Sequence, residues 1–407
     1  MRPINFLFLL IFFSANIFGH GGVTRVSILK EAELRLFVAD NLDSTLVTID
    51  FPSGEIINRV STPPSIMTLQ IGGKNNYIFA MRGRDTDQDL VSIIDTGYDN
   101  LSQNFRQPFV LRTLPMDTPG GGRNNGGHVM ATVNGFNAVL TEGNGEIVVF
   151  ETDTFDGFSD LKTKTYNLAS PDHYHYQEGE KFLYIGHLFG GFVQILDKDT
   201  GEEYGRINNC PRLHGMGRDH DTGRLFFSCM REVVVVGTRG KERAKEVSRI
   251  VYPDSGRSCA AFLEGRDRVR WCYTEGIIPQ LYRLDASNEE YQFQILKVEP
   301  SIRQQVTKDG KYLMILTREG SLSLHDGYDG SFIRNIKLSD TFEGQWNEDV
   351  GKAILPDIVS QNGIAYVSLT HEGRVAVIDL EAGEVKRYID TGGFPTRMVL
   401  LSKDELN

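Results

Sequence analysis

The sequence predicts an all-β fold, a single propeller of eight four-stranded blades, with seven blades as the alternative. Three observations lead to this prediction. The chain is rich in Val, Ile and Gly, and almost no stretch of its 407 residues holds a helical period beyond two turns. A strand-like segment recurs along the chain. The two ends of the chain each carry part of a blade.

The recurring segment alternates apolar and polar residues, follows a Gly or small polar turn, and usually ends in an acidic residue. Its eight copies end at Asp50, Asp95, Glu151, Asp197, Gly237, Asp285, Asp326 and Asp379. Spacings of 40 to 56 residues are typical of repeat architectures. The long interval before Glu151 is the reason why seven blades remain the alternative.

Each copy lies within a group of strand-like segments, as in Asn362–Ile389. Two strands precede the copy, and a turn and one more strand follow it. The turns Pro-Ser-Gly-Glu, Asp-Thr-Gly-Glu and Glu-Ala-Gly-Glu place Gly54, Gly201 and Gly383 where a positive φ is expected. Four short antiparallel strands form a propeller blade, and because one blade cannot bury both of its faces, the blades must stack into a ring.

The ends of the chain complete this ring. Gly392–Leu401 matches the first strand of a blade but has no partner strands after it. Leu34–Val60 contains the later strands of a blade but no innermost strand. Joining the two segments completes one blade and removes two exposed sheet edges.

The interval of roughly Gly97 to Gly127 contains Asp-Thr-Pro-Gly-Gly-Gly-Arg-Asn-Asn-Gly-Gly-His near its end. This Gly, Pro and Asn content is unsuited to a regular strand. We therefore expect the interval to be an exposed, mobile loop.

Residues 1–19 have the pattern of a secretory signal peptide: Arg2, then an apolar run, then the small residues Ser14, Ala15 and Gly19. The propeller domain would then comprise residues 20–407, located in the periplasm or secreted. No second apolar run approaches the roughly 20 residues of a membrane-spanning helix. The formal net charge of −11 argues against nucleic acid and anionic membranes as partners.

The four cysteines fall at equivalent places in two successive hairpins. If a turn is centred near His220, antiparallel pairing places Cys210 opposite Cys229, and the next blade similarly places Cys259 opposite Cys272. Two such pairs in an oxidising compartment favour two disulfides. A zinc site made of the four cysteines, or of two cysteines and two histidines, is the alternative.

Four of the nine histidines fall on the predicted first strands of blades three, four and five. These are His128, His173, His175 and His214. Because the innermost strands of adjacent blades are neighbours, these imidazoles can reach one volume, and imidazole suits zinc. His173 and His175 share a strand face, so either can join the group. The alternative is that each histidine is a polar residue satisfied by backbone groups or water.

The other histidines are weaker candidates. His325 is predicted to be a packed residue of a third strand, and His187 and His371 to be solvated residues at strand ends or turns. His220, beside Asp219 and Asp221, is a candidate for weak metal binding at the rim. The sequence has no GxSxG elbow, no HExxH motif and no phosphate-binding loop, so it shows no activated nucleophile.

Three segments stand out together: Cys-Pro-Arg-Leu-His-Gly at Cys210–Gly215 followed by Phe-Phe-Ser-Cys, Pro-Asp-His-Tyr-His-Tyr at Pro171–Tyr176, and the segment Phe342–Leu401. They resemble the AztD family of periplasmic zinc metallochaperones, propeller proteins that pass zinc to the solute-binding protein of a zinc ABC importer. The resemblance covers nearly the whole chain after residue 19, in order. The Cys-Pro-x-Leu-His-Gly motif is its most specific part.

The resemblance implies a disulfide between Cys210 and Cys229, and metal-binding roles for His173 and His214, with His128 near the family's histidine in the third blade. The chain departs from the family in one place. Residues 95–127, where the family has a flexible segment rich in histidine and acidic residues, contain no histidine.

We therefore expect a monomeric, extracytoplasmic zinc-binding propeller that is not an enzyme and that delivers zinc to a solute-binding protein. His128, His173 and His214 would hold the zinc, with His175 or a carboxylate completing the set. Two alternatives stay open. One is a metal-independent interaction module. The other is a metal-dependent, lactonase-like hydrolase whose candidate bases are Asp172 and Asp357.

Overall fold

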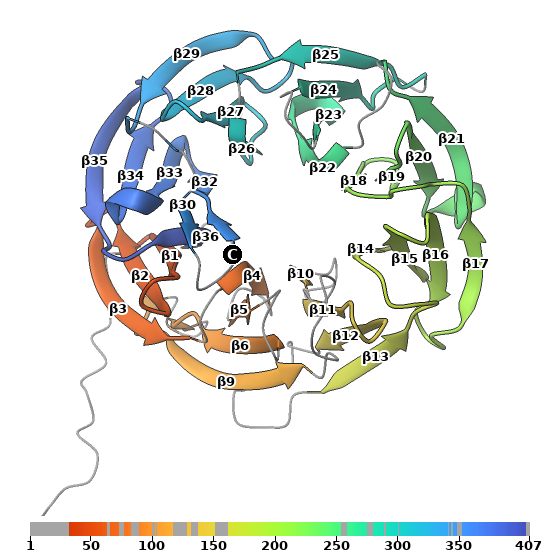
Figure 1. The fold of residues 1–407 in the computed structure, drawn as a ribbon, viewed down its shortest axis with the longest axis horizontal. Helices are drawn as coiled ribbons and strands as arrows, with labels where there is room; N and C mark the ends of the chain where they lie inside the picture. Colours follow the sequence, from red (N-terminus) through yellow and green to blue (C-terminus); the bar gives the residue numbers. More distant parts are fainter. Residues whose placement is uncertain are drawn as a thin grey trace, which may run out of the picture.

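Eight four-stranded antiparallel sheets surround a central axis like the blades of a propeller (Figure 1). This computed structural model describes residues 32–403, except for residues 63–65, 73–76, 83–88, 100–101, 103, 117–127, 132–136, 151–161, 254–258, 275–279, 289, 300, 341, 343–344 and 348–351. The predicted propeller is confirmed, and the alternative of seven blades is wrong. The predicted signal peptide at residues 1–19 lies outside the described residues.

The blades are numbered along the chain, and their strands are given from the inner to the outer edge. Blade 1 contains β36 (Pro395–Ser402), β1 (Leu34–Asp40), β2 (Thr45–Phe51) and β3 (Glu55–Ser61). Blade 2 contains β4 (Ile66–Gly72), β5 (Tyr77–Arg82), β6 (Asp89–Asp95) and β9 (Phe109–Met116). Blade 3 contains β10 (His128–Ala131), β11 (Asn137–Thr141), β12 (Glu146–Phe150) and β13 (Thr163–Asn167). Blade 4 contains β14 (Tyr174–Glu178), β15 (Phe182–His187), β16 (Phe192–Asp197) and β17 (Glu203–Ile207).

The second half of the ring follows the same order. Blade 5 contains β18 (Met216–Arg218), β19 (Leu225–Ser228), β20 (Glu232–Gly237) and β21 (Lys245–Val251). Blade 6 contains β22 (Cys259–Glu264), β23 (Val269–Thr274), β24 (Gln280–Asp285) and β25 (Phe293–Lys297). Blade 7 contains β26 (Ser301–Val306), β27 (Tyr312–Thr317), β28 (Ser321–Asp326) and β29 (Phe332–Lys337). Blade 8 contains β32 (Ile358–Gln361), β33 (Ile364–Leu369), β34 (Arg374–Asp379) and β35 (Glu384–Asp390).

Short elements lie between the blades or within their turns. The hairpins are β7 (Tyr98–Asp99) with β8 (Asn104–Phe105) and β30 (Gln345–Asn347) with β31 (Lys352–Ile354). The 3₁₀ turns are η1 (Gly240–Glu242), η2 (Arg266–Arg268) and η4 (Thr370–Glu372). No helix among the described residues is long and apolar enough to cross a membrane.

The segment that recurs in the sequence is the third strand of every blade, from β2 in blade 1 to β34 in blade 8. The turns after it use glycine as predicted, since Gly54, Gly201 and Gly383 have φ values of 76°, 76° and 74°. Middle strands such as β1 are buried on both faces, whereas the outer strand β35 alternates between exposed and covered residues. The core therefore lies between neighbouring blades.

The first and last described strands close the ring. β36 pairs antiparallel with β1, with Leu36 opposite Leu400 and Val38 opposite Met398. Side chains of this joint blade pack on Tyr366 of blade 8. The predicted closure of the ring by the two ends of the chain is confirmed.

The predicted loop from Gly97 to Gly127 is wrong for its first part. Residues 98–99 and 104–105 form the hairpin β7–β8, and residues 109–116 form β9, the outer strand of blade 2. Residues 117–127 lie outside the described residues. The hairpin is anchored because the Arg35 guanidinium donates hydrogen bonds to the backbone oxygens of Thr96 and Arg106 and lies 4.5 Å from the centre of the Phe105 ring.

Arg35 also forms a buried ion pair with Asp50, with Nε 2.7 Å from Oδ1 and Nη2 3.0 Å from Oδ2. Asp50→Ala leaves this guanidinium buried without its counter-charge, so we expect the free energy of unfolding to fall by about 3–5 kcal/mol. Urea denaturation measures the loss. Glu55→Ala, at an exposed position of β3, is the control and should change stability by less than about 0.5 kcal/mol. Equal effects of the two substitutions would contradict this prediction.

His325 is a packed residue of a third strand, as predicted, with its Nδ1 2.9 Å from the Gly330 oxygen and its Nε2 3.0 Å from Ser323 Oγ. Burial lowers its pKa, although the contact with Gly330 raises it. The unfolded chain therefore accepts a proton more readily at this residue, and stability should fall as the pH drops below about 6.5. In His325→Gln we expect a smaller loss of stability between about pH 7.5 and pH 5 than in the wild type. The matched control is the exposed His220→Gln, and a wild-type pH slope in His325→Gln would contradict the prediction.

Candidate metal centre

Three histidines from blades 4 and 5 converge at the inner ends of their blades. His173 directly precedes β14, His175 is the second residue of β14, and His214 lies two residues before β18. One ligand atom from each lies within 4.8 Å of the others. Among the described residues, this is the one group of three or more His, Cys, Asp or Glu side chains close enough to hold a metal ion.

The rings of these three histidines contact one another. His173 and His214 are stacked, with ring centres 5.3 Å apart, and His175 stands edge-on to both, at 5.4 Å and 5.2 Å. Tetrahedral zinc with Zn–N bonds of about 2.05 Å requires nitrogens about 3.3 Å apart. The three imidazoles suit zinc as donors, and binding would require side-chain rotation together with release of the hydrogen bond that His175 Nε2 accepts from Gly215 N–H.

A carboxylate from blade 3 orients one of these rings. Glu142, in the turn after β11, is buried, and its Oε1 lies 2.7 Å from His173 Nδ1. A histidine that binds a metal usually donates its other ring N–H to such a carboxylate. A proton on Nδ1, the nitrogen that faces this carboxylate, would leave the lone pair of Nε2 for a metal. The sequence analysis did not identify Glu142; its only signal was an acidic residue directly after a predicted strand.

Asp172 fixes the backbone on which His173 stands. Its buried carboxylate accepts hydrogen bonds from the backbone N–H groups of His173, Phe189 and Gly190, and it lies 3.6 Å from His187 Nδ1. Burial alone would raise the pKa of Asp172, but the bonds from His187 and these backbone groups outweigh it and lower the pKa below its usual value. Asp172 is therefore a positioning group, which does not fit the hydrolase alternative.

His187 was expected to be solvated, and this expectation is wrong. The side chain has no exposed surface, and its Nε2 lies 3.1 Å from Gln194 Oε1. The reason is that β15 ends beneath the turn held by Asp172, so the histidine is enclosed between that carboxylate and the neighbouring strand β16.

The Cys-Pro-Arg-Leu-His-Gly motif builds the backbone around His214. Cys210 is bonded to Cys229, with Cα atoms 4.8 Å apart, and Leu213 packs in the core against blade 4. Gly215 has a φ of 96°, and a Cβ atom there would overlap the Cys259 oxygen. The backbone N–H of Gly215 donates a hydrogen bond to His175 Nε2 at 3.1 Å. The motif thus places His214 and holds His175 at the same time.

The second predicted disulfide, between Cys259 and Cys272, is also present, so the alternative of a cysteine-ligated zinc site is wrong. The expected register differs in both hairpins. Cys259 pairs with Thr274 across a bulge, and Cys210 lies before β18 rather than within it. Both deviations arise because the backbone turns irregularly at the start of these blades.

His128 is the first residue of β10 and pairs with Leu140. This register places it at the same end of blade 3 as Glu142. Its side chain lies outside the described residues, so its role stays a prediction.

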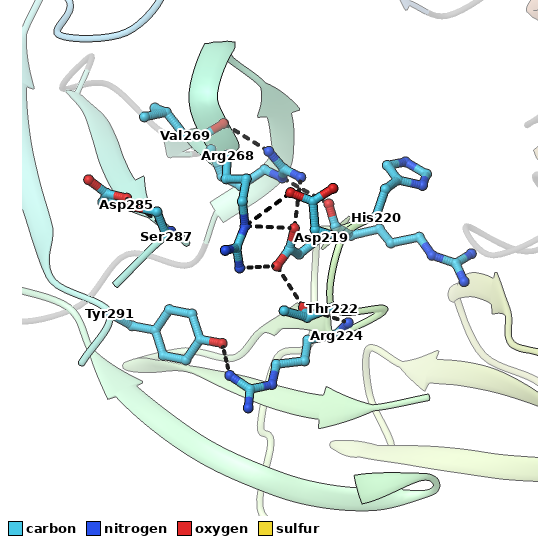
Figure 2. Close-up of polar contacts among 12 residues, drawn as sticks. Asp219, His220, Thr222, Arg224, Arg268, Val269, Asp285, Ser287 and Tyr291 are labelled. Carbon is cyan, nitrogen blue, oxygen red and sulfur yellow. Dashed lines mark hydrogen bonds and ion pairs between the residues drawn. The ribbon is translucent and has the colours of Figure 1, made fainter. Parts of the chain in front are cut away.

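The possible rim site around His220 is not formed in the part of the chain that the structure describes. Asp219 is buried and turned toward Arg268 Nη2 and Thr222 Oγ1, both at 2.6 Å (Figure 2). His220 points away from this carboxylate, and its Nε2 lies 3.2 Å from Glu264 Oε1. Asp219 therefore joins the hairpins of blades 5 and 6 and does not face His220.

No protein-family model matches the sequence, and a comparison with curated proteins also finds no match. Among solved structures, apo AztD from Citrobacter koseri is similar, with a TM-score of 0.74, 18% identity, and coverage of 91% of this chain and 98% of AztD. The dihydro-heme d1 dehydrogenase NirN, in complex with DHE, has a TM-score of 0.62 and 11% identity, covering 92% of this chain and 76% of NirN. A putative 6-phosphogluconolactonase from Bacteroides uniformis has a TM-score of 0.54 and 10% identity, covering 76% and 98%. At these identities the likeness establishes the fold, and the first structure comes from the family that the sequence motifs resemble.

Gly215→Ala tests how closely the motif packs against blade 6. We expect a large loss of stability, several kcal/mol, because the Cβ meets the backbone of blade 6 and the left-handed φ is itself unfavourable for alanine. Gly363→Ala is the matched control, since Gly363 has a φ of 75° and open space where a Cβ atom would lie. It should lose only about 1–2 kcal/mol in urea denaturation. Similar losses in the two variants would show that close packing at Gly215 has no effect.

Proposed function

We propose that this protein is an extracytoplasmic zinc metallochaperone of the AztD type. It holds zinc at His173, His175 and His214, with His128 as a further ligand, and passes the metal to the solute-binding protein of a zinc ABC importer. The observation that carries the proposal is the convergence of three imidazoles beside a buried carboxylate that orients one of them. The structural likeness to AztD and the shared motifs support it.

The donor set suits a protein that releases its metal. Imidazoles are neutral ligands of intermediate softness, and a site without thiolates exchanges zinc more readily than a closed cysteine site. His175 and His214 are only half-buried, so an incoming ligand can approach them. The reaction would be ligand exchange, without bond cleavage in a substrate, and the protein would not be an enzyme.

The cysteines support an extracytoplasmic location for the protein. All four cysteines are in disulfides, which persist in oxidising compartments. Together with the N-terminal pattern of residues 1–19, this supports a periplasmic or secreted protein. In the periplasm, the chain would meet the solute-binding protein of the importer that we propose as its partner.

Zinc binding is tested on the untagged chain by competition with a chelating dye and by thermal unfolding. Zinc at about 100 times its Kd should stabilise the wild type by about 2.7 kcal/mol. The double variant His173→Ala and His214→Ala should lose this effect. Glu142→Gln keeps every ligand but removes the carboxylate partner of His173, so its affinity should fall about 10- to 100-fold.

A double variant of two histidines outside the cluster, His220→Ala and His371→Ala, is the matched control and should bind zinc like the wild type. Wild-type affinity in the His173 and His214 double variant would overturn the zinc site. Delivery is tested separately by mixing the zinc-loaded chain with the metal-free solute-binding protein and measuring the metal on each. Loading of the partner no faster than from free zinc would refute delivery.

A further inference from the structure

Three short segments of blades 4 and 5 form one continuous surface beside the histidine cluster. They are residues 188–191 after β15, residues 211–212 before β18, and residues 230–231 after β19. The backbone N–H of Cys210 donates to the Gly191 oxygen at 2.8 Å, and that of Met230 donates to the Pro211 oxygen at 2.8 Å. The loop before β18 therefore lies between the two turns and joins them.

This surface is fixed to the backbone that carries the histidines. The Asp172 carboxylate accepts hydrogen bonds from the N–H groups of both Phe189 and His173. The N–H of His214 donates to the Ser228 oxygen at 2.9 Å, at the end of the strand that leads into residues 230–231. A molecule that binds this surface therefore lies next to the candidate metal centre.

The side chains on this surface are of the types that protein interfaces favour. Phe189 is 70% exposed although its backbone is held, Pro211, Arg212 and Arg231 are exposed, and Met230 is partly exposed. Aromatic residues, Met and Arg are enriched at interfaces, and an aromatic side chain on a fixed backbone is a frequent hot spot. Arg212 also has a φ of 52°, in the left-handed region that favours glycine, so this exposed position holds an arginine at a cost to the backbone.

The charge of the surface is opposite to that of the whole chain. Residues 187–192, 208–215 and 229–231 contain two arginines and no acidic residue, whereas the formal net charge of the chain is −11. The adjacent Glu232 is occupied by Arg249, with Oε1 2.5 Å from Nη1. Within the part of the chain that the structure describes, Arg212 and Arg231 form no ion pair. A partner with an acidic surface would therefore be attracted to this patch and repelled by much of the remaining surface.

Zinc transfer by ligand exchange requires the ligands of the acceptor to reach the metal at about 2 Å, so the acceptor must rest on the surface around the histidines. We propose that Phe189, Pro211, Arg212, Met230 and Arg231 form the docking surface for the solute-binding protein. Phe189 enters an apolar depression of the partner, and the two arginines face carboxylates at the rim of that depression. This inference rests on the proposed function and names the surface that delivery uses.

Binding of the zinc-loaded chain to the immobilised, metal-free solute-binding protein tests the surface by surface plasmon resonance. Phe189→Ser should weaken binding by about tenfold or more. The matched control is Phe332→Ser on the outer strand β29, where the phenylalanine is 60% exposed, and it should bind like the wild type. Both variants should keep wild-type zinc affinity in the chelating-dye assay, because neither side chain belongs to the histidine cluster.

The charges are tested with the double variant Arg212→Glu and Arg231→Glu. At about 50 mM salt its association should be about tenfold slower or more, and the difference should shrink at about 0.5 M salt because exposed charges are screened. The control is Lys245→Glu with Lys297→Glu, which changes the net charge equally at exposed positions of outer strands. It should slow association by less than about twofold.

The two proposals fail in different ways. If the wild type binds the partner through Phe189 but delivers no zinc, the proposed delivery fails and the docking surface stands. If delivery occurs but Phe189→Ser and Phe332→Ser bind the partner equally well, the docking surface is wrong. No binding of the partner by the wild type would also overturn it.

Discussion

The pairing of β36 with β1 joins the two ends of the chain, and the arrangement of every other blade depends on it. Each blade buries its faces only against its neighbours, so an open ring would expose an apolar face on blade 8 and another on blade 1. Polar groups reinforce the closure. Asn41 donates to Thr396 Oγ1 across 355 residues of sequence, and Arg35 binds Asp50 and the hairpin of the next blade. Because the ring is closed, the innermost strands of the repeats are held at fixed positions around the axis.

The histidine site uses those positions at three successive blades. Glu142 comes from a turn of blade 3, His173 and His175 from the start of blade 4, and His214 from the approach to blade 5. None of these segments makes the site alone. Backbone groups help to hold them: Asp172 accepts a hydrogen bond from the N–H of Phe189, and the N–H of Gly215 donates one to His175. On the opposite side of the ring, a carboxylate likewise joins neighbouring blades. Asp357 pairs with Arg303 of β26 and accepts a hydrogen bond from the backbone N–H of Met398 on β36.

Much of the fold could be predicted from the sequence because the signal repeats. The alternation in the third strands, the glycine turns and the divided first blade are local patterns that recur, and the structure confirms them. The outer strand β9 was missed because it follows a loop-like stretch, in which the hairpin β7–β8 is held by Arg35, a residue distant in the sequence. The burial of His187 was missed for the same reason.

The candidate site could be predicted only in part. Histidines at matching positions of a repeat show which side chains can meet, so His173, His175 and His214 could be found together. Glu142 lies in another blade and at a different point of the repeat, and its distance to His173 depends on how the blades stack.

If the chain binds zinc as proposed, the disulfide between Cys210 and Cys229 has a consequence for the metal as well as for the fold. Before this bond forms, the newly made chain carries two thiols close to His214, and thiolates are stronger zinc ligands than imidazoles. In such a chain, Cys210, Cys229 and His214 would form a competing zinc site within one segment. Oxidation removes the competing sulfur ligands at the same moment as it sets the backbone of His214. The maturation of the chain would thus determine which ligands the metal meets first.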